Sequence, residues 1–115
     1  MRAVQLRLGS RDDVRLWRAN TGSGWVRVGA GAYRPQTFGV PGQPDLMGCL
    51  TVSGLGVWLG VEVKFGRGRQ SDTQIAFARV MGLCGAVYIL TRDPDDAERQ
   101  LNSAIDTITA RMKDT

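Results

Sequence analysis

The chain has 115 residues, a formal net charge of +4 and an apolar fraction of 43%, which predicts one domain with a single hydrophobic core. No apolar run approaches the roughly 20 residues that a membrane helix requires, and the first ten residues lack a secretory signal, so we expect a cytoplasmic protein without a membrane segment. Histidine is absent and the two cysteines, Cys49 and Cys84, lie far apart, which excludes zinc fingers, histidine general bases and serine triads.

The N-terminal part predicts a short helix followed by a β-hairpin. Residues 2–9 place Val4 and Leu8 on one helical face, and the glycine at the end of this segment is suited to stop the helix. Residues 13–22 and 24–30 alternate apolar and polar side chains with a period of two, around the turn-rich segment ANTGSG. This pattern is typical of two paired strands, so we expect a hairpin here.

A loop and a second hairpin are expected next. Residues 33–44 contain three prolines and two glycines, which favours an irregular loop. Residues 45–52 and 57–65 are apolar runs that flank the turn signal SGLG. We expect these two runs to pair as antiparallel strands.

The C-terminal part predicts a helix, a strand and a second helix. Ser71 and Gln74 have the spacing of a capping box, which opens a helix that reaches about Leu83. Residues 86–92 form a short apolar strand, and Asp93 with the proline after it starts an amphipathic helix. The expected order is therefore α-β-β-β-β-α-β-α, an α/β fold in which a mixed sheet is flanked by helices.

Three charged residues lie in the otherwise apolar second hairpin. Glu62 and Lys64 share one face of their strand, about 7 Å apart. If Val52 pairs with Val57, Asp45 lies opposite Lys64 and diagonal to Glu62, whereas a loop of odd length would turn Asp45 to the other face. Two carboxylates near one point repel each other unless a cation lies between them. Because the chain has no histidine, the ligands would be oxygen atoms, which suit Mg²⁺, Mn²⁺ or Ca²⁺.

The alternative interpretation is a solvated Glu–Lys pair on a half-exposed strand, with Asp45 capping a turn after Pro44. The flanking segments favour a phosphate site. A basic, glycine-rich exit at residues 66–74 leads into a helix N-terminus, where N–H groups and the helix dipole attract phosphate. Gly60 lies on the same face as Glu62, and we expect its missing side chain to leave room for the backbone of a ligand.

These segments resemble the VRR-NUC domain, a branch of the PD-(D/E)xK nuclease superfamily. The resemblance is carried by GVPGQPDLMG, GVEVKFGRGRQSDTQIAF and GAVYIL, in which PD, ExK and a following glutamine occur in order, and it covers about residues 12–97. It implies a single nuclease domain over residues 1–115 with a restriction-endonuclease-like core.

The resemblance also implies roles for individual residues. Asp45 and Glu62 would bind Mg²⁺ or Mn²⁺ together with the main-chain carbonyl of Val63. Lys64 would position or activate the attacking water, and Gln74 would contact the nucleophile or the phosphate. The segment LWRANTG looks like the arginine and asparagine turn that precedes the motif in short phage-type members.

The first helix departs from the family pattern. VRR-NUC domains usually carry a glutamate on this helix as a further ligand for metal or water, whereas residues 2–9 contain no acid. Gln5 is the candidate for that position. The departure weighs against a second metal ion.

Basic residues gather in the first part of the chain. Residues 1–70 hold ten Lys or Arg and four Asp or Glu, whereas residues 71–115 hold five and seven. Arginine suits phosphate recognition, and phosphate contacts position a duplex without reading its bases. A solvated basic surface is the alternative. We expect DNA contacts first from Arg67 and Arg69, and then from Arg18, Arg27 and Arg34.

Two tryptophans and the two cysteines have further interpretations. We expect Trp17 to pack in the core or at an interface, and Trp58 to meet DNA or a second subunit because it shares a face with Glu62. Cys49 and Cys84 lie in apolar stretches, and we expect both to be buried thiols.

The sequence thus favours a metal-dependent endonuclease that hydrolyses DNA phosphodiester bonds. The resemblance to stand-alone phage-type members implies a homodimer that cuts branched DNA such as Holliday junctions, encoded by a phage or prophage and acting in a bacterial host cell. A twofold dimer would supply two matched cuts, with the final helix or the first hairpin as its interface. Two alternatives stay open: a generic phage or restriction-like nuclease without junction preference, and a catalytically weak module that only binds DNA.

Overall fold

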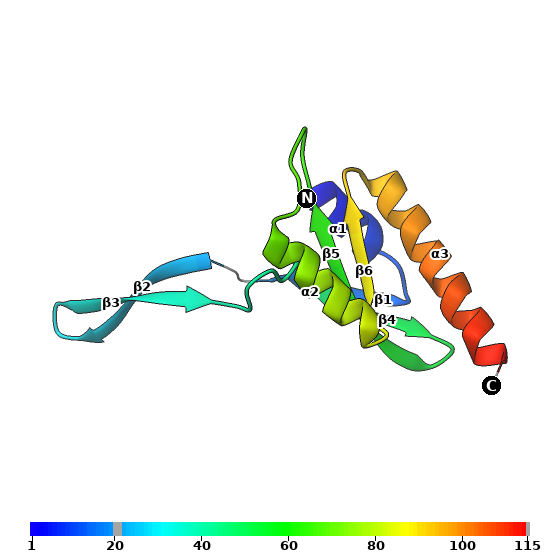
Figure 1. Ribbon diagram of the computed structural model, residues 1–115, viewed down its shortest axis with the longest axis horizontal. Helices are drawn as coiled ribbons and strands as arrows, with labels where there is room; N and C mark the ends of the chain where they lie inside the picture. Colours follow the sequence, from blue (N-terminus) through cyan, green and yellow to red (C-terminus); the bar gives the residue numbers. More distant parts are fainter. Residues whose placement is uncertain (20–21, 115) are drawn as a thin grey trace.

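A computed structural model describes residues 1–19 and 22–114 of the protein. Within these residues four strands form one mixed sheet in the order β1-β4-β5-β6, and two further strands form a separate ribbon (Figure 1). The elements are α1 (Arg2–Gly9), β1 (Val14–Arg18), β2 (Gly22–Gly29), β3 (Ala32–Phe38), β4 (Leu46–Val52), β5 (Leu55–Val63), α2 (Asp72–Leu83), β6 (Val87–Thr91) and α3 (Pro94–Lys113).

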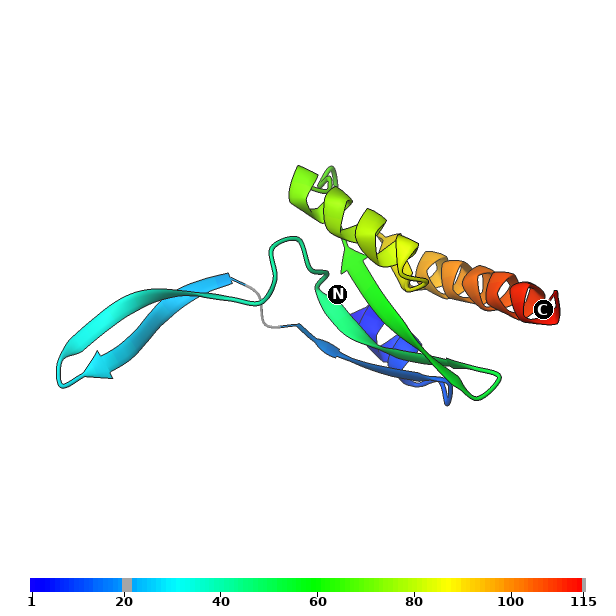
Figure 2. The same ribbon diagram turned by 60° about the horizontal axis from the view of Figure 1, so that its bottom comes forward.

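Helices cover both faces of the mixed sheet, as expected for the α/β class. The strands β1, β4 and β5 are antiparallel neighbours, and β6 runs parallel to β5. One sheet face contributes Leu50 and Leu59 to a core that also contains Leu8 of α1 and Leu101 of α3. The other face meets α2, which lies above the sheet in Figure 2. No helix in the described ranges is both long and apolar enough to cross a membrane.

The first predicted hairpin is wrong. β1 pairs with β4, and β2 pairs with β3, which runs through much of the segment that we expected to be a loop. The turn between β2 and β3 contains Gly31 with φ 72°, a conformation that glycine adopts readily. Pro35 is tolerated in β3 because a two-stranded ribbon has open edges. The element order therefore gains one strand, and positions 20–21 of the predicted ANTGSG turn lie outside the described residues.

The second predicted hairpin is confirmed, with a shorter turn than expected. Ser53 and Gly54 form a two-residue connection, with φ of 50° and 81°, as a type I′ turn requires. Val52 consequently pairs with Leu55 rather than with Val57. The predicted capping box at the start of α2 and the Asp93 cap of α3 are also confirmed.

The two cysteines are not buried as predicted, and Trp17 does not lie in the core. Trp17 is 53% exposed because it lies on the edge strand β1. Cys49 is only half-buried, and Cys84 is exposed at the C-terminal end of α2. An apolar neighbourhood in the sequence did not predict burial at these positions, since the exposure of each depends on which elements pack over it.

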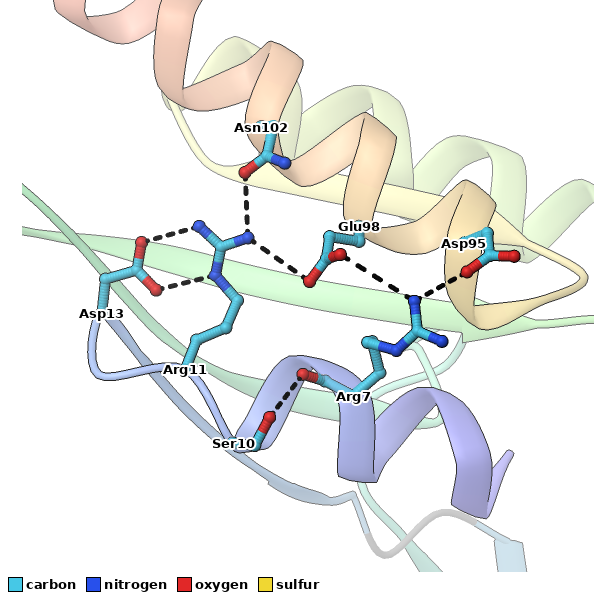
Figure 3. A network of polar contacts seen from close by, with 7 residues as sticks. All are labelled: Arg7, Ser10, Arg11, Asp13, Asp95, Glu98 and Asn102. Atoms are coloured by element: carbon cyan, nitrogen blue, oxygen red, sulfur yellow. Dashed lines mark hydrogen bonds and ion pairs between the residues drawn. The ribbon is translucent and has the colours of Figure 1, made fainter.

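Charged side chains hold α1 and the turn after it against α3 (Figure 3). Arg7 donates to Asp95 at 2.7 Å, and Arg11 donates to both carboxylate oxygens of Asp13 at 2.9 and 3.0 Å. Glu98 of α3 lies 3.8 Å from each of these two arginines. The network fixes the two helices on the sheet face opposite α2.

The substitution Asp13→Asn is expected to lower the free energy of unfolding by about 0.5–1 kcal/mol near neutral pH, as for a partly exposed ion pair with two hydrogen bonds. The hydrogen bond from Arg11 lowers the pKa of Asp13 below its usual value. The ionised carboxylate therefore stabilises the fold above the pKa that it has in the unfolded chain, and this contribution disappears as the pH falls through the lower folded-state pKa. Urea unfolding at about pH 7 and about pH 3 measures both effects.

The exposed neighbour Asp12 provides the matched control, and Asp12→Asn should leave the free energy of unfolding nearly unchanged. A difference between wild type and Asp13→Asn that stays the same at about pH 3 would show that charge pairing is not its cause.

Candidate active site

Asp45 and Glu62 lie opposite each other at the end of the β4–β5 hairpin. Asp45 directly precedes Leu46, which pairs with Val61 at the open end of the hairpin. If the same register is extended by one residue, Asp45 lies opposite Glu62, and not opposite Lys64 as we expected. The register differs from the expected one by two residues, which leaves every side chain on its predicted face. Asp45 Oδ2 accepts a hydrogen bond from the N–H of Val63 at 2.9 Å. Both carboxylates therefore lie on the face of the sheet that meets α2.

Gln74 of α2 links Lys64 to Glu62. Lys64 Nζ donates to Gln74 Oε1 at 3.1 Å, and Gln74 Nε2 donates to Glu62 Oε1 at 3.1 Å. Lys64 Nζ is also 3.5 Å from the same Glu62 oxygen. Gln74 Oε1 in addition accepts the N–H of Ser71 and so completes the capping box. The start of α2 and the predicted site thus share one side chain.

Glu62 is buried, with 2% of its surface exposed. Burial, the negative charge of Asp45 and hydrogen bonding with Asp45 raise the pKa of Glu62 to about 7, against the opposing effect of Lys64. A divalent cation between the two carboxylates would remove their repulsion. The chemistry of these oxygen donors, together with the carbonyl of Val63, therefore fits Mg²⁺ or Mn²⁺.

The described residues contain no group of three or more Asp, Glu, Cys or His side chains placed to hold a metal ion. A site with two carboxylates is sufficient for Mg²⁺, which commonly keeps several waters and binds substrate phosphate oxygens. Water and phosphate would therefore complete the coordination here.

Gln5 was the candidate to replace the acid that VRR-NUC domains carry on their first helix, and the structure does not bring it to Asp45 or Glu62. The helix α1 packs on β1 and α3. Gln5 lines a hollow with Leu6 and Leu16. Leu16 lies on the face of β1 that packs against the core, which is the sheet face away from α2. Its side chain makes no hydrogen bond within the described part of the chain. The expectation that Gln5 takes the ligand position is therefore not supported.

Tyr88 of β6 is a site residue that sequence reasoning missed. Its hydroxyl donates to Glu62 Oε2 at 3.4 Å. Burial and the charge of Glu62 raise the pKa of Tyr88 above its usual value. The sequence offered one signal for this role, a tyrosine within an apolar strand. A buried tyrosine hydroxyl usually has a hydrogen-bond partner, so a polar group near Tyr88 could have been expected.

Trp58 fills the space over Gly60 that we expected a ligand to use. A Cβ atom at Gly60 would overlap the ring of Trp58 and lie 2.9 Å from Pro44. The Trp58 ring packs 6.1 Å from Phe77 of α2, which lies 6.4 Å from Tyr88. The missing side chain at Gly60 therefore leaves room for the Trp58 ring, and the three aromatic side chains pack α2 over β5 and β6. The expectation that a ligand backbone occupies the space at Gly60 is wrong.

The loop before Asp45 is also packed against α2. Gly42 has a φ of 82° and lies so close to the first turn of the helix that a side chain would overlap the main chain of Thr73. Pro44, directly before Asp45, is fully buried. These contacts fix the position of the Asp45 carboxylate relative to Gln74.

Two of the predicted DNA-binding arginines lie next to the site. Arg67 and Arg69 are exposed in the loop that connects β5 to α2. Arg92 holds this loop by donating to the main-chain carbonyls of Gly66 and Gly68, each at 2.7 Å. The two exposed arginines are thus carried by an anchored loop that begins directly after Lys64.

The other predicted arginines are not brought to the site. Arg18 ends β1 opposite Leu46, and the strand alternation places it on the sheet face away from Glu62. Arg27 and Arg34 lie on the β2–β3 ribbon, which extends away from the sheet in Figure 1.

Comparisons of the chain with protein-family models, with curated proteins and with solved structures found no match.

Proposed function

We propose that the protein is a metal-dependent endonuclease that hydrolyses phosphodiester bonds in DNA. The observation that carries this proposal is the cluster in which Gln74 bonds both Glu62 and Lys64, with the Asp45 carboxylate beside them. Hydrolysis of a phosphodiester requires oxygen ligands for a cation, a group that orients water, and positive charge near the phosphate. The cluster contains side chains suited to each of these tasks.

Asp45, Glu62 and the carbonyl of Val63 would hold one Mg²⁺ or Mn²⁺. Such an ion supplies positive charge to the scissile phosphate and lowers the pKa of a bound water. The two carboxylates come from adjacent strands of one sheet, so their separation is set by the ladder. This rigidity favours a cation with a demanding coordination geometry.

Lys64 orients the attacking water and stabilises the negative charge that develops on the phosphate. The water gives up a proton to the solvent as its oxygen bonds to phosphorus, the bond to the leaving oxygen breaks, and the leaving oxygen takes up a proton from the solvent. Gln74 holds the Lys64 ammonium in place through its 3.1 Å hydrogen bond. Arg67 and Arg69 contact the flanking phosphates, which positions the strand without reading its bases.

We further propose branched DNA, such as a four-way junction, as the substrate and a homodimer as the active form. This part is supported by the resemblance to stand-alone phage-type VRR-NUC domains and by the symmetry argument, since a twofold dimer presents two matched sites to a symmetric junction. A phage or prophage origin and action in the bacterial cytoplasm belong to the same proposal.

A second candidate function is a module that binds DNA without cutting it. One specific observation favours it: α1 carries no acid, and its Gln5 lines a hollow with Leu16 that contains neither carboxylate. A site with an incomplete ligand set would retain its basic surface and lose catalytic power.

Cleavage of matched linear, flap and four-way-junction DNAs tests these alternatives. Wild type should cut the junction in symmetric pairs with Mg²⁺ or Mn²⁺, and not with EDTA. Equal cutting of all three substrates would replace the junction preference with a generic nuclease activity. Binding of the DNAs without cutting in any metal would favour the second candidate and overturn the first.

A further inference from the structure

The β2–β3 ribbon stands apart from the rest of the molecule. Its two strands form a sheet of their own, and both views show it extending away from the sheet that carries the site (Figures 1 and 2). The protein measures 59 × 33 × 28 Å, and strands of this length extend by about 25 Å. A lone two-stranded ribbon is marginally stable in water, so a ligand that contacts this one would stabilise it.

One face of the ribbon carries an exposed row of three side chains, Trp25, Arg27 and Tyr33. Arg27 and Tyr33 are directly paired across the two strands, and Trp25 lies two residues before Arg27 on the same face. Trp25 is 72% exposed and Tyr33 is 61% exposed. Arg27 Nε donates to the carbonyl of Gly29 at 3.3 Å, which leaves most of its five N–H donors for a ligand.

The charge of the segment indicates what the partner is. Residues 22–38, which form the ribbon, contain two arginines, Arg27 and Arg34, and no Asp or Glu, so the ribbon complements a polyanion. Pairing of two ribbons from two copies would bring like charges together, which disfavours a second copy as the partner. Exposed aromatic rings make apolar contacts with the thymine methyl groups in the major groove, and arginine binds phosphate oxygens. The major groove of DNA is wide enough to admit a two-stranded ribbon.

We propose that the β2–β3 ribbon is an arm that binds DNA beyond the scissile phosphate, with Trp25, Arg27 and Tyr33 against the nucleic acid. The inference rests on the proposed function, because it takes DNA as the ligand, and it extends that function with a length requirement. A duplex of about 10 base pairs spans about 34 Å, and one of about 30 base pairs spans about 100 Å. Compared with the 59 Å long axis of the protein, the longer duplex extends past the whole molecule, whereas the shorter one covers only part of it.

Fluorescence anisotropy of both duplexes, with the full-length chain in EDTA, tests the arm without cleavage. The double substitution Trp25→Ser, Tyr33→Ser and the single substitution Arg27→Glu should each weaken binding of the longer duplex about tenfold or more. Both should weaken binding of the shorter duplex by a smaller factor, because that duplex covers only part of the molecule. Arg27→Lys, which keeps the charge, should retain most of the affinity.

Two controls have the same charge reversal at other positions. Arg34→Glu lies on the opposite face of the ribbon and should weaken binding less than Arg27→Glu. Arg111→Glu lies near the C-terminal end of α3, away from the ribbon in Figure 1, and should have less than about a twofold effect. Thermal unfolding confirms that each variant keeps the fold, because the substituted side chains are exposed.

Unchanged affinity of the ribbon variants for the longer duplex would overturn the inference, and the proposed function would stand if the wild type still cuts DNA. Sedimentation velocity tests whether the ribbon instead contacts a second copy of the chain. If the ribbon variants lose self-association and keep their DNA affinity, the ribbon serves contacts between copies. Wild-type protein that binds neither duplex would overturn the inference and the proposed function together.

Discussion

Replacement of Lys64 by alanine is expected to slow metal-dependent DNA cleavage by about 10²–10⁴-fold, the usual contribution of a positioned group that moves or holds a proton. Lys64 Nζ lies between Glu62 and Gln74, and its side chain is 19% exposed. The ammonium is therefore held by protein groups on one side and accessible to a substrate on the other. DNA affinity should change little, because Arg67 and Arg69 remain in place.

Single-turnover cleavage at saturating protein separates the chemical step from binding. Lys113→Ala is the matched control, since Lys113 is the other lysine of the chain and lies at the end of α3. Anisotropy in EDTA then measures the affinity of both variants. A cleavage rate of Lys64→Ala that equals the rate of wild type would show that this cluster is not where the DNA is cut.

The candidate site could be predicted from sequence because it depends on strand alternation more than on exact register. The predicted partner of Asp45 was Lys64, and the ladder instead sets it opposite Glu62. An error of two residues preserves the face of every side chain, so the carboxylates were still placed together. Gln74 was predictable for a different reason, since a capping box depends only on residues three apart.

The strand pairing of the N-terminal part could not be predicted in the same way. Period-two alternation in residues 13–30 identifies strands, but it does not say which strand each will pair with. β1 pairs with β4, which is about 30 residues away in sequence, and the two strands form five residue pairs. Pro35 and the glycines of residues 33–44 favoured a loop, although an open-edged ribbon accommodates them.

Contacts that support the site were also beyond sequence reasoning. Tyr88 reaches Glu62 only because β6 lies parallel to β5. Trp58 covers Gly60 because Phe77 of α2 packs against its ring. Each of these contacts joins elements whose relative placement is set by the whole fold, so no local pattern of residues predicts it.

The substitution Asp45→Asn is expected to abolish cleavage and, at the same time, to stabilise the metal-free protein. The negative charge of Asp45 acts against that of the buried Glu62, so a neutral side chain removes a repulsion. The amide oxygen of asparagine can still accept the N–H of Val63, which Asp45 binds at 2.9 Å. We expect the free energy of unfolding in EDTA at about pH 8 to rise by about 0.5–2 kcal/mol, the usual range of stabilising substitutions.

Metal should make wild type more stable than Asp45→Asn, the reverse of the order in EDTA, because a ligand that binds only the folded state stabilises it. Addition of Mn²⁺ should raise the unfolding temperature of wild type and leave that of Asp45→Asn unchanged, while cleavage by the variant falls at least about 100-fold. Asp106→Asn, an exposed acid on α3, is the control that removes the same charge away from the site. If Asp45→Asn instead lowers the stability in EDTA, Asp45 serves the fold mainly as the acceptor for Val63. If the variant still cuts DNA, Asp45 is not a metal ligand. A gain of stability together with a loss of both activity and metal response would show that the two carboxylates are held close at a cost to the fold, which a bound cation offsets.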